Sequence, residues 1–298
     1  MILINLHIFW YITIMSFIQY VLDNEHCYWD WSDLSANPNI SFEDVLRNPD
    51  RPWDYRELSR NPNITLDIVD NHPEILWSHK GLTKNPNITM DMMKRRRDIR
   101  WDTESLSENP NITWDFIIEN PDIEWNYVYI AQNANITWDI IHSNKKLFDK
   151  YVYQISQNPN ITWDIVTSEE GSIIKWDYQT LVGNPGITID DFIENIDFLE
   201  NNAGYTLIED PVLRFECRWH CIGMNPNVTW EIINSQDEYS DIHWHNYSVC
   251  LNPNISLKII RDNSERLCYH SQISKNTMTH YPHWNLVRSL NNEPYVLK

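Results

Sequence analysis

The residues best able to do chemistry are cysteines and histidines in the last third of the chain. They fall in two groups, Cys217, His220 and Cys221, and then His243, His245 and Cys250. Thiolate and imidazole groups bind Zn²⁺ in tetrahedral sites, and a spacing of four residues on a helix brings two of them together. No Cys-x-x-Cys pair is present, which favours buried structural cysteines. We therefore assign no metal ligand and no cofactor, and a metal-dependent activity in this region is the weaker alternative.

A carboxylate also recurs at nearly regular intervals along the sequence. It occurs at Asp67, Asp91, Asp115, Asp139 and Asp164. Each position is expected in the first turn of a helix, where negative charge meets the positive end of the helix dipole. The chain lacks a glycine-rich nucleotide loop, a nucleophile elbow, a zinc-protease helix and a kinase motif set. We predict no catalytic residue, and a protein that is not an enzyme.

Nine asparagines stand in Asn-x-Ser/Thr and are formal glycosylation acceptors. They are Asn39, Asn63, Asn87, Asn111, Asn135, Asn160, Asn227, Asn254 and Asn246. Modification would require entry into a secretory compartment. A helix cap already explains the Ser/Thr and a turn explains the Asn, so the structural interpretation is favoured.

The charge of the chain bears on its partners. Lys and Arg total 23 against 42 Asp and Glu, a formal charge of −19. A surface this acidic repels phosphate backbones, which argues against nucleic acid and favours basic proteins or peptides. The basic run Lys94–Arg97 is interpreted as a solvated loop between helices. The 5 cysteines lack regular spacing and predict no disulfide framework, so a reducing, intracellular location is favoured.

These residues are set within a tandem repeat. The element Asn-Pro-Asn-Ile-Thr, or a close variant, starts at Asn37, Asn61, Asn85, Asn109, Asn133, Asn158, Asn184, Asn225 and Asn252. Successive copies are 24, 24, 24, 24, 25, 26, 41 and 27 residues apart. Such a near-constant period predicts one structural unit repeated along the chain.

The first half of each unit reads as a short helix. In one copy Thr113 is the predicted N-cap, Ile112 and Ile117 form a hydrophobic staple, and Asn120 before a proline ends the helix. The outer staple column is Ile40, Ile64, Ile88, Ile112, Ile136, Ile161, Ile187, Val228 and Ile255. The inner column is Val45, Val69, Met93, Ile117, Ile141, Val166, Phe192, Ile233 and Ile260.

A second helix is predicted to open at a tryptophan and to end at the next Asn-Pro. The tryptophans are Trp53, Trp77, Trp101, Trp125, Trp176 and Trp244, with Trp29 marking a degenerate earlier unit. Lys150 and Cys217 replace the tryptophan in two units, where stacking should be less regular. We expect the tryptophans to be buried between helices. We also expect the asparagine before each proline to be buried and hydrogen-bonded to backbone.

The string Asn-Pro-Asn-Ile-Thr-Trp-Asp at Asn158–Asp164 resembles the uncharacterised tandem-repeat proteins of giant DNA viruses of the mimivirus type. The resemblance covers roughly residues 29–275. It implies a viral origin and residence in an infected host cell, and it brings no activity.

The sequence thus predicts an all-α solenoid of short helix pairs, about ten repeats of roughly 24 residues. The array is placed at 23–275, with an irregularity at 198–214 that is a binding loop, an eroded repeat or an additional helical turn. Residues 276–298 form a C-terminal cap or tail. The apolar segment Met1–Leu22 is a buried first helix, a membrane anchor or a cleaved leader.

We expect a non-enzymatic scaffold for protein–protein interaction. A membrane-anchored or virion-associated structural protein, tethered by Met1–Leu22, is the alternative.

Overall fold

The computed structural model describes residues 16–202, 220–235 and 244–278. Within these ranges every regular element is a helix, and no strand occurs. The all-α prediction is therefore confirmed for the described part of the chain. The helices are short, between four and seven residues, so each depends on packing against its neighbours for stability.

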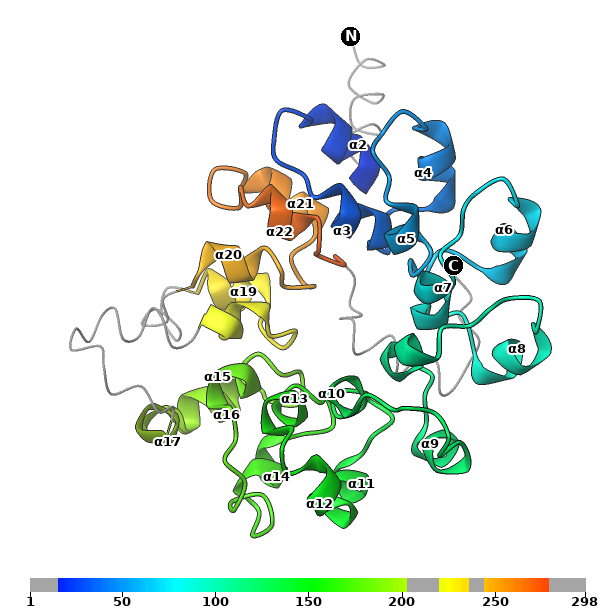
Figure 1. Ribbon diagram of the computed structural model, residues 1–298. Coiled ribbons are helices and arrows are strands. Elements are labelled where there is room, and N and C mark those ends of the chain that lie inside the picture. The colour runs from blue at the N-terminus through cyan, green and yellow to red at the C-terminus, as the bar shows by residue number, and fades with distance from the viewer. Residues whose placement is uncertain (1–15, 203–219, 236–243, 279–298) are drawn as a thin grey trace.

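The helices alternate between two kinds along the chain. The first helices of the units are α2 (Phe17–Asp23), α4 (Phe42–Arg47), α6 (Leu66–Asn71), α8 (Met90–Arg95), α9 (Trp114–Glu119), α11 (Trp138–Ser143), α14 (Trp163–Thr167), α16 (Ile189–Glu194), α19 (Trp230–Ile233) and α21 (Leu257–Asp262). The second helices are α3 (Trp31–Ala36), α5 (Tyr55–Leu58), α7 (His79–Lys84), the 3₁₀ helix η1 (Thr103–Glu108), α10 (Tyr127–Ile130), α13 (Val152–Ser156), α15 (Tyr178–Leu181), the 3₁₀ helix η2 (His220–Met224), α20 (Asn246–Val249) and α22 (His270–Ile273). From α4 to α14, the first helices lie outside and the second helices inside (Figure 1).

The first helices begin and end as the repeat predicts. In α9 the Thr113 hydroxyl accepts a hydrogen bond from the Phe116 N–H at 3.2 Å, and Asn120 is the C-cap. The two staple residues Ile112 and Ile117 are buried. Every outer staple residue is buried, and of the inner column only Val69 is half-buried. The cap and the staple together fix where each first helix starts.

The tryptophans do not open the second helices, which corrects the prediction. The N-cap is the following residue, as at Asp54, whose carboxylate accepts from the first turn of α5. The Trp53 indole N–H instead donates to the carbonyl oxygen of Asn48, five residues earlier, at 2.9 Å. It thereby fastens the loop between the two helices. Trp53 is buried as expected, whereas Trp77, Trp101 and Trp125 are half-buried.

The unit that lacks this tryptophan is filled by a different residue. An additional helix, α12 (Lys145–Phe148), follows α11, and it buries Phe148 rather than Lys150. The Phe148 ring packs 5.9 Å from the rings of both Trp114 and Tyr127. Phe148 is two residues before Lys150, the position where the repeat places a tryptophan. Alignment of the units on their asparagines alone therefore misses it. Cys217, the other substitution, lies outside the described residues.

Two irregular segments are described in part. Helix α2 packs Phe17, Ile18, Tyr20 and Val21 into the core, which supports the buried-helix alternative for this part of Met1–Leu22. Residues 1–15 lie outside the described ranges, and no described helix has the length and apolar character needed to cross a membrane. In the 198–214 irregularity, α17 (Ile196–Asn202) adds a helix after α16, and 203–219 lie outside the described ranges.

The two ends of the array meet, so the described helices follow a ring (Figure 1). Asn37 Nδ2 donates to the carbonyl oxygens of Ser274 and Asn276 at 2.8 and 2.9 Å, across 239 residues of sequence. The Trp29 and His270 rings are 4.9 Å apart. Asn276, which takes part in this contact, is one residue beyond the predicted array boundary at 275.

Candidate functional site

Asparagine side chains recur at the same place in every turn of the array. We call the first asparagine of each turn a ladder asparagine: Asn37, Asn61, Asn85, Asn109, Asn133, Asn158, Asn184, Asn225, Asn252 and Asn276. Asn61 Nδ2 donates to the carbonyl oxygens of Ser35, Asn37 and Ile40 at 2.9, 2.8 and 3.2 Å. Its Oδ1 accepts from the Asn63 N–H at 2.8 Å. One buried amide thus joins two successive units and closes its own turn.

The ladder asparagines are all buried, and each donates to backbone of the preceding unit. The prediction of buried asparagines with side-chain-to-backbone bonds is confirmed. Burial with satisfied polar groups is what a structural role requires, since an unpaired buried amide is costly. Asn276 was missed because no proline follows it, although its distance of 24 residues from Asn252 was a usable signal.

The second asparagine of each turn forms a parallel series. Asn63 Nδ2 donates to the carbonyl oxygens of Pro38 and Ile40 at 2.7 and 2.9 Å. Its two N–H groups are therefore engaged in the joint between units, and the same holds for the equivalent Asn111. This cross-unit role was not predicted. It favours the structural interpretation of the Asn-x-Ser/Thr motifs over glycosylation.

Small hydroxyl residues provide a third link between units. Ser35 Oγ donates to the Trp31 carbonyl oxygen at 2.7 Å and accepts from the Asp54 N–H at 2.9 Å. Thr83 does the same between His79 and Asp102. Sequence reasoning overlooked this column, although a Ser or Thr two residues before most ladder asparagines would have indicated it.

The chain matches no protein-family model, no curated protein and no solved structure. Its function must therefore be argued from the surfaces that the joints between units leave unused.

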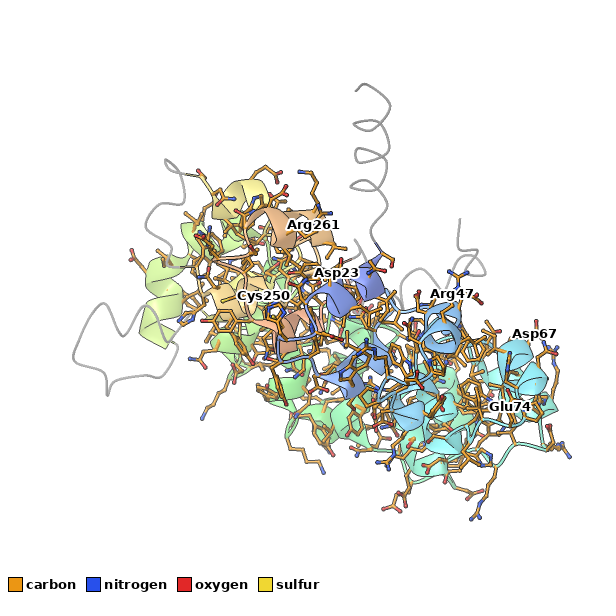
Figure 2. All side chains as sticks on the ribbon, turned by 90° about the horizontal axis from the view of Figure 1, so that it is seen from above. Asp23, Arg47, Asp67, Glu74, Cys250 and Arg261 are labelled. Atoms are coloured by element: carbon orange, nitrogen blue, oxygen red, sulfur yellow. The ribbon has the colours of Figure 1, made fainter. Side chains whose placement is uncertain are left out.

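An acidic column runs along the first helices. From α4 to α19 the second residue of each first helix is acidic and exposed: Glu43, Asp67, Asp91, Asp115, Asp139, Asp164, Asp190 and Glu231. The same position holds Ile18 in α2 and Lys258 in α21. In α6, α8 and α9 the N-cap bond comes from the preceding Thr, so Asp67, Asp91 and Asp115 act through the helix dipole and not as caps. Figure 2 shows Asp67 at the outer edge of the molecule. The column presents regularly spaced negative charge to solvent.

The Cys/His region does not assemble into a chemical site in the described part of the chain. No group of three metal-ligating side chains forms there, and Cys217 and His243 lie outside it. Burial raises the pKa of both Cys221 and Cys250 to about 11. These two thiols are therefore protonated at neutral pH and behave as core residues. The described cysteines form no disulfide with one another.

The basic run lies at the end of α8 and in the loop after it. Arg96 donates to both carboxylate oxygens of Asp70, at 3.0 and 2.9 Å, and also to Asp98. Its hydrogen bonds to Asp98 and then Asp70 raise the pKa of the guanidinium. Lys94, Arg95, Arg97 and Arg100 are exposed, as a solvated loop predicts.

Proposed function

We propose that the protein is a non-enzymatic scaffold, a solenoid of about ten helical repeats of roughly 24 residues that closes into a ring. The partner is a basic protein or peptide, and the binding surface is the acidic column of the first helices. The observation that carries the proposal is that different polar side chains of each unit face the interior and the solvent. The repeated amides, hydroxyls and indoles are used in the joints and loops, whereas the repeated carboxylates are exposed.

The spacing of the carboxylates supports an extended partner. Among the described residues, only Glu43 of this column has an ion pair, with Arg47 at 2.9 Å. A chain carrying several Lys or Arg side chains could meet one carboxylate per unit. Such contacts give orientation and speed of association, and they weaken with salt because exposed charges are screened.

The test compares two variants with the same loss of charge. The column variant carries Asp91→Asn, Asp115→Asn and Asp139→Asn, and the loop variant carries Asp50→Asn, Asp122→Asn and Glu124→Gln, which are also exposed. Binding of a decalysine peptide is measured by calorimetry at low salt. We expect about threefold weaker binding for the column variant than for the loop variant. Equal affinities would mean that only net charge matters and would refute the column as the binding surface.

A further inference from the structure

A hollow lined mainly by basic side chains lies between α5, α7 and η1. It measures about 280 Å³ and is lined by Arg56, Glu57, Arg60, Lys80, Gly81, Lys84 and Glu108. Its four basic and two acidic side chains leave a formal charge of +2. The whole chain carries −19, so this site opposes the charge of the molecule around it. It is formed by second helices, which lie inside the first helices in this part of the ring (Figure 1).

Two of the four cations are held in place by carboxylates. Arg60, two residues beyond the end of α5, donates through Nε to Glu57 of α5, and Lys84 Nζ donates to Glu108 of η1 at 2.6 Å. The side chains of Lys84 and Glu108 are only 20% and 24% exposed, so this pair is largely fixed. Arg60 and Lys84, which come from successive units, are therefore two cations of the hollow whose positions are fixed by carboxylates.

The other two cations are Arg56 and Lys80. Both are exposed, and within the described residues neither pairs with a carboxylate. They occupy equivalent positions on α5 and α7, three residues after Trp53 and Trp77. Their donors are thus available to an anion that enters between them.

Gly81 allows two of the lining elements to come together. The equivalent position carries Glu57 in α5 and Ser105 in η1. A Cβ added at Gly81 would lie 2.5 Å from the Arg56 carbonyl oxygen and 2.7 Å from the Ser59 Cβ. Glycine therefore allows α7 to approach α5 closely, and it leaves the floor of the hollow as bare backbone.

We propose that this hollow binds a small phosphate monoester. A monoester carries nearly two negative charges at neutral pH, which matches the charge of +2. Its oxygens suit the planar fork of Arg56 and the point charge of Lys80. The volume of about 280 Å³ is just below the range for ligand pockets, which begins at about 300 Å³, so the hollow fits a small organic phosphate better than a nucleotide or a peptide.

The experiment is calorimetric titration of the full chain with glycerol 3-phosphate, with dimethyl phosphate as the singly charged control. We expect saturable binding of the monoester at millimolar concentrations or below, and about tenfold weaker binding of the diester. The double variant Arg56→Gln/Lys80→Gln should weaken monoester binding about tenfold or more. The matched variant Arg95→Gln/Arg97→Gln removes the same charge from the end of α8 and the loop after it, and should stay within about twofold of wild type.

All four substituted side chains are exposed, so both variants should fold, and far-UV circular dichroism verifies this. Equal weakening in the two double variants would show that net charge alone attracts the anion, and would overturn the site. Absence of saturable binding by wild type would also overturn it. So would binding of a phosphoserine peptide by a chain that does not bind glycerol 3-phosphate.

Discussion

The joint between two consecutive units and the joint that closes the ring use the same chemistry. Asn61 Nδ2 contacts the carbonyl oxygens of Ser35 and Asn37, and Asn37 Nδ2 contacts those of Ser274 and Asn276 in the same way. The Asp30 N–H donates to Ser274 Oγ at 3.2 Å, as the Asp54 N–H donates to Ser35 Oγ at 2.9 Å. The closing joint thus repeats these hydrogen bonds of an interior joint.

The difference between the two joints is the covalent chain. An interior joint is crossed by the backbone at its Asn-Pro turn, whereas the closing joint is held by side-chain bonds and packing. Open repeat arrays need capping units with a polar outer face. Here each terminal unit covers the other. The closing joint should therefore be where the ring opens first.

The largest loss of stability should come from removing a large side chain within a unit. This loss can then be compared with the losses at the joints. Trp101→Ala removes a half-buried ring and its indole bonds to the Met93 and Arg96 carbonyl oxygens. We expect the free energy of unfolding to fall by about 3–5 kcal/mol in urea denaturation. Leu76→Ala, at a side chain that is 91% exposed, is the control and should change it by less than about 0.5 kcal/mol. A loss below about 1 kcal/mol for Trp101→Ala would show that the ring contributes little to packing.

An interior joint should follow. Asn85→Ala removes the donor to the carbonyl oxygens of Ser59, Asn61 and Ile64 and leaves a buried gap. We expect a loss of about 2–4 kcal/mol, because these carbonyls would stay buried with fewer partners. Asn71→Ala, at an exposed residue of α6, should be nearly neutral in the same assay. Similar losses of unfolding free energy in the two variants would show that the ladder asparagines do not stabilise the fold.

The closing joint should show a smaller and more local effect. Asn37→Ala removes the bonds to Ser274 and Asn276, and the separated ends can then be solvated. We expect about 1–2 kcal/mol in global unfolding. Hydrogen exchange should accelerate in α3 and α22 while α7 and η1 stay protected. Uniform acceleration around the ring would show that the closing joint does not open independently.

The smallest effect concerns the ion pair across the closing joint. Asp33 and Lys275 are 3.5 Å apart, and the lysine is half exposed, so the pair should contribute less than about 1 kcal/mol. Burial raises the pKa of Asp33, although Lys275 partly counteracts it. The folded chain therefore keeps this proton to higher pH than the unfolded chain. The stabilisation that comes from protonated Asp33 is therefore fully present below the pKa of this carboxyl in the unfolded chain. It is lost as the pH rises through the pKa in the folded chain.

Asp33→Asn isolates this titration. Urea unfolding of both proteins across the acidic range should show wild type losing stability relative to the variant as the pH rises. A difference that runs in the opposite sense would mean that Lys275, rather than burial, dominates the environment of Asp33.

The sequence predicts the local features of a unit well, because they depend on neighbouring residues. Thr113, Ile112 and Asn120 specify a cap, a staple and a stop within one stretch of chain. The cross-unit bonds of Asn63 do not follow from neighbouring residues, since its turn alone accounts for an asparagine. Those of Ser35 are indicated only when the copies are compared, because a Ser or Thr recurs two residues before most ladder asparagines. Phe148 was missed because an inserted turn shifts it away from the periodic position. Closure depends on the small rotation from each unit to the next, which no single residue encodes.

The two candidate surfaces also differ in whether neighbouring residues in the sequence reveal them. The exposed carboxylates of the first helices followed from their periodicity. The basic hollow did not, because Arg56, Lys80 and Glu108 come from three successive units and gather only through the packing around Gly81.

A ring whose ends meet limits how the chain can change in length. Gain or loss of one whole unit would carry the last ladder asparagine past Asn37 or leave it short, and the ends would no longer meet. Lengthening within a unit has no such penalty. Asn184 and Asn225 are 41 residues apart, yet Asn225 Nδ2 still donates to the carbonyl oxygens of Val182, Asn184 and Ile187. The chain can therefore lengthen between two ladder asparagines, but it cannot gain or lose a whole unit without opening the ring.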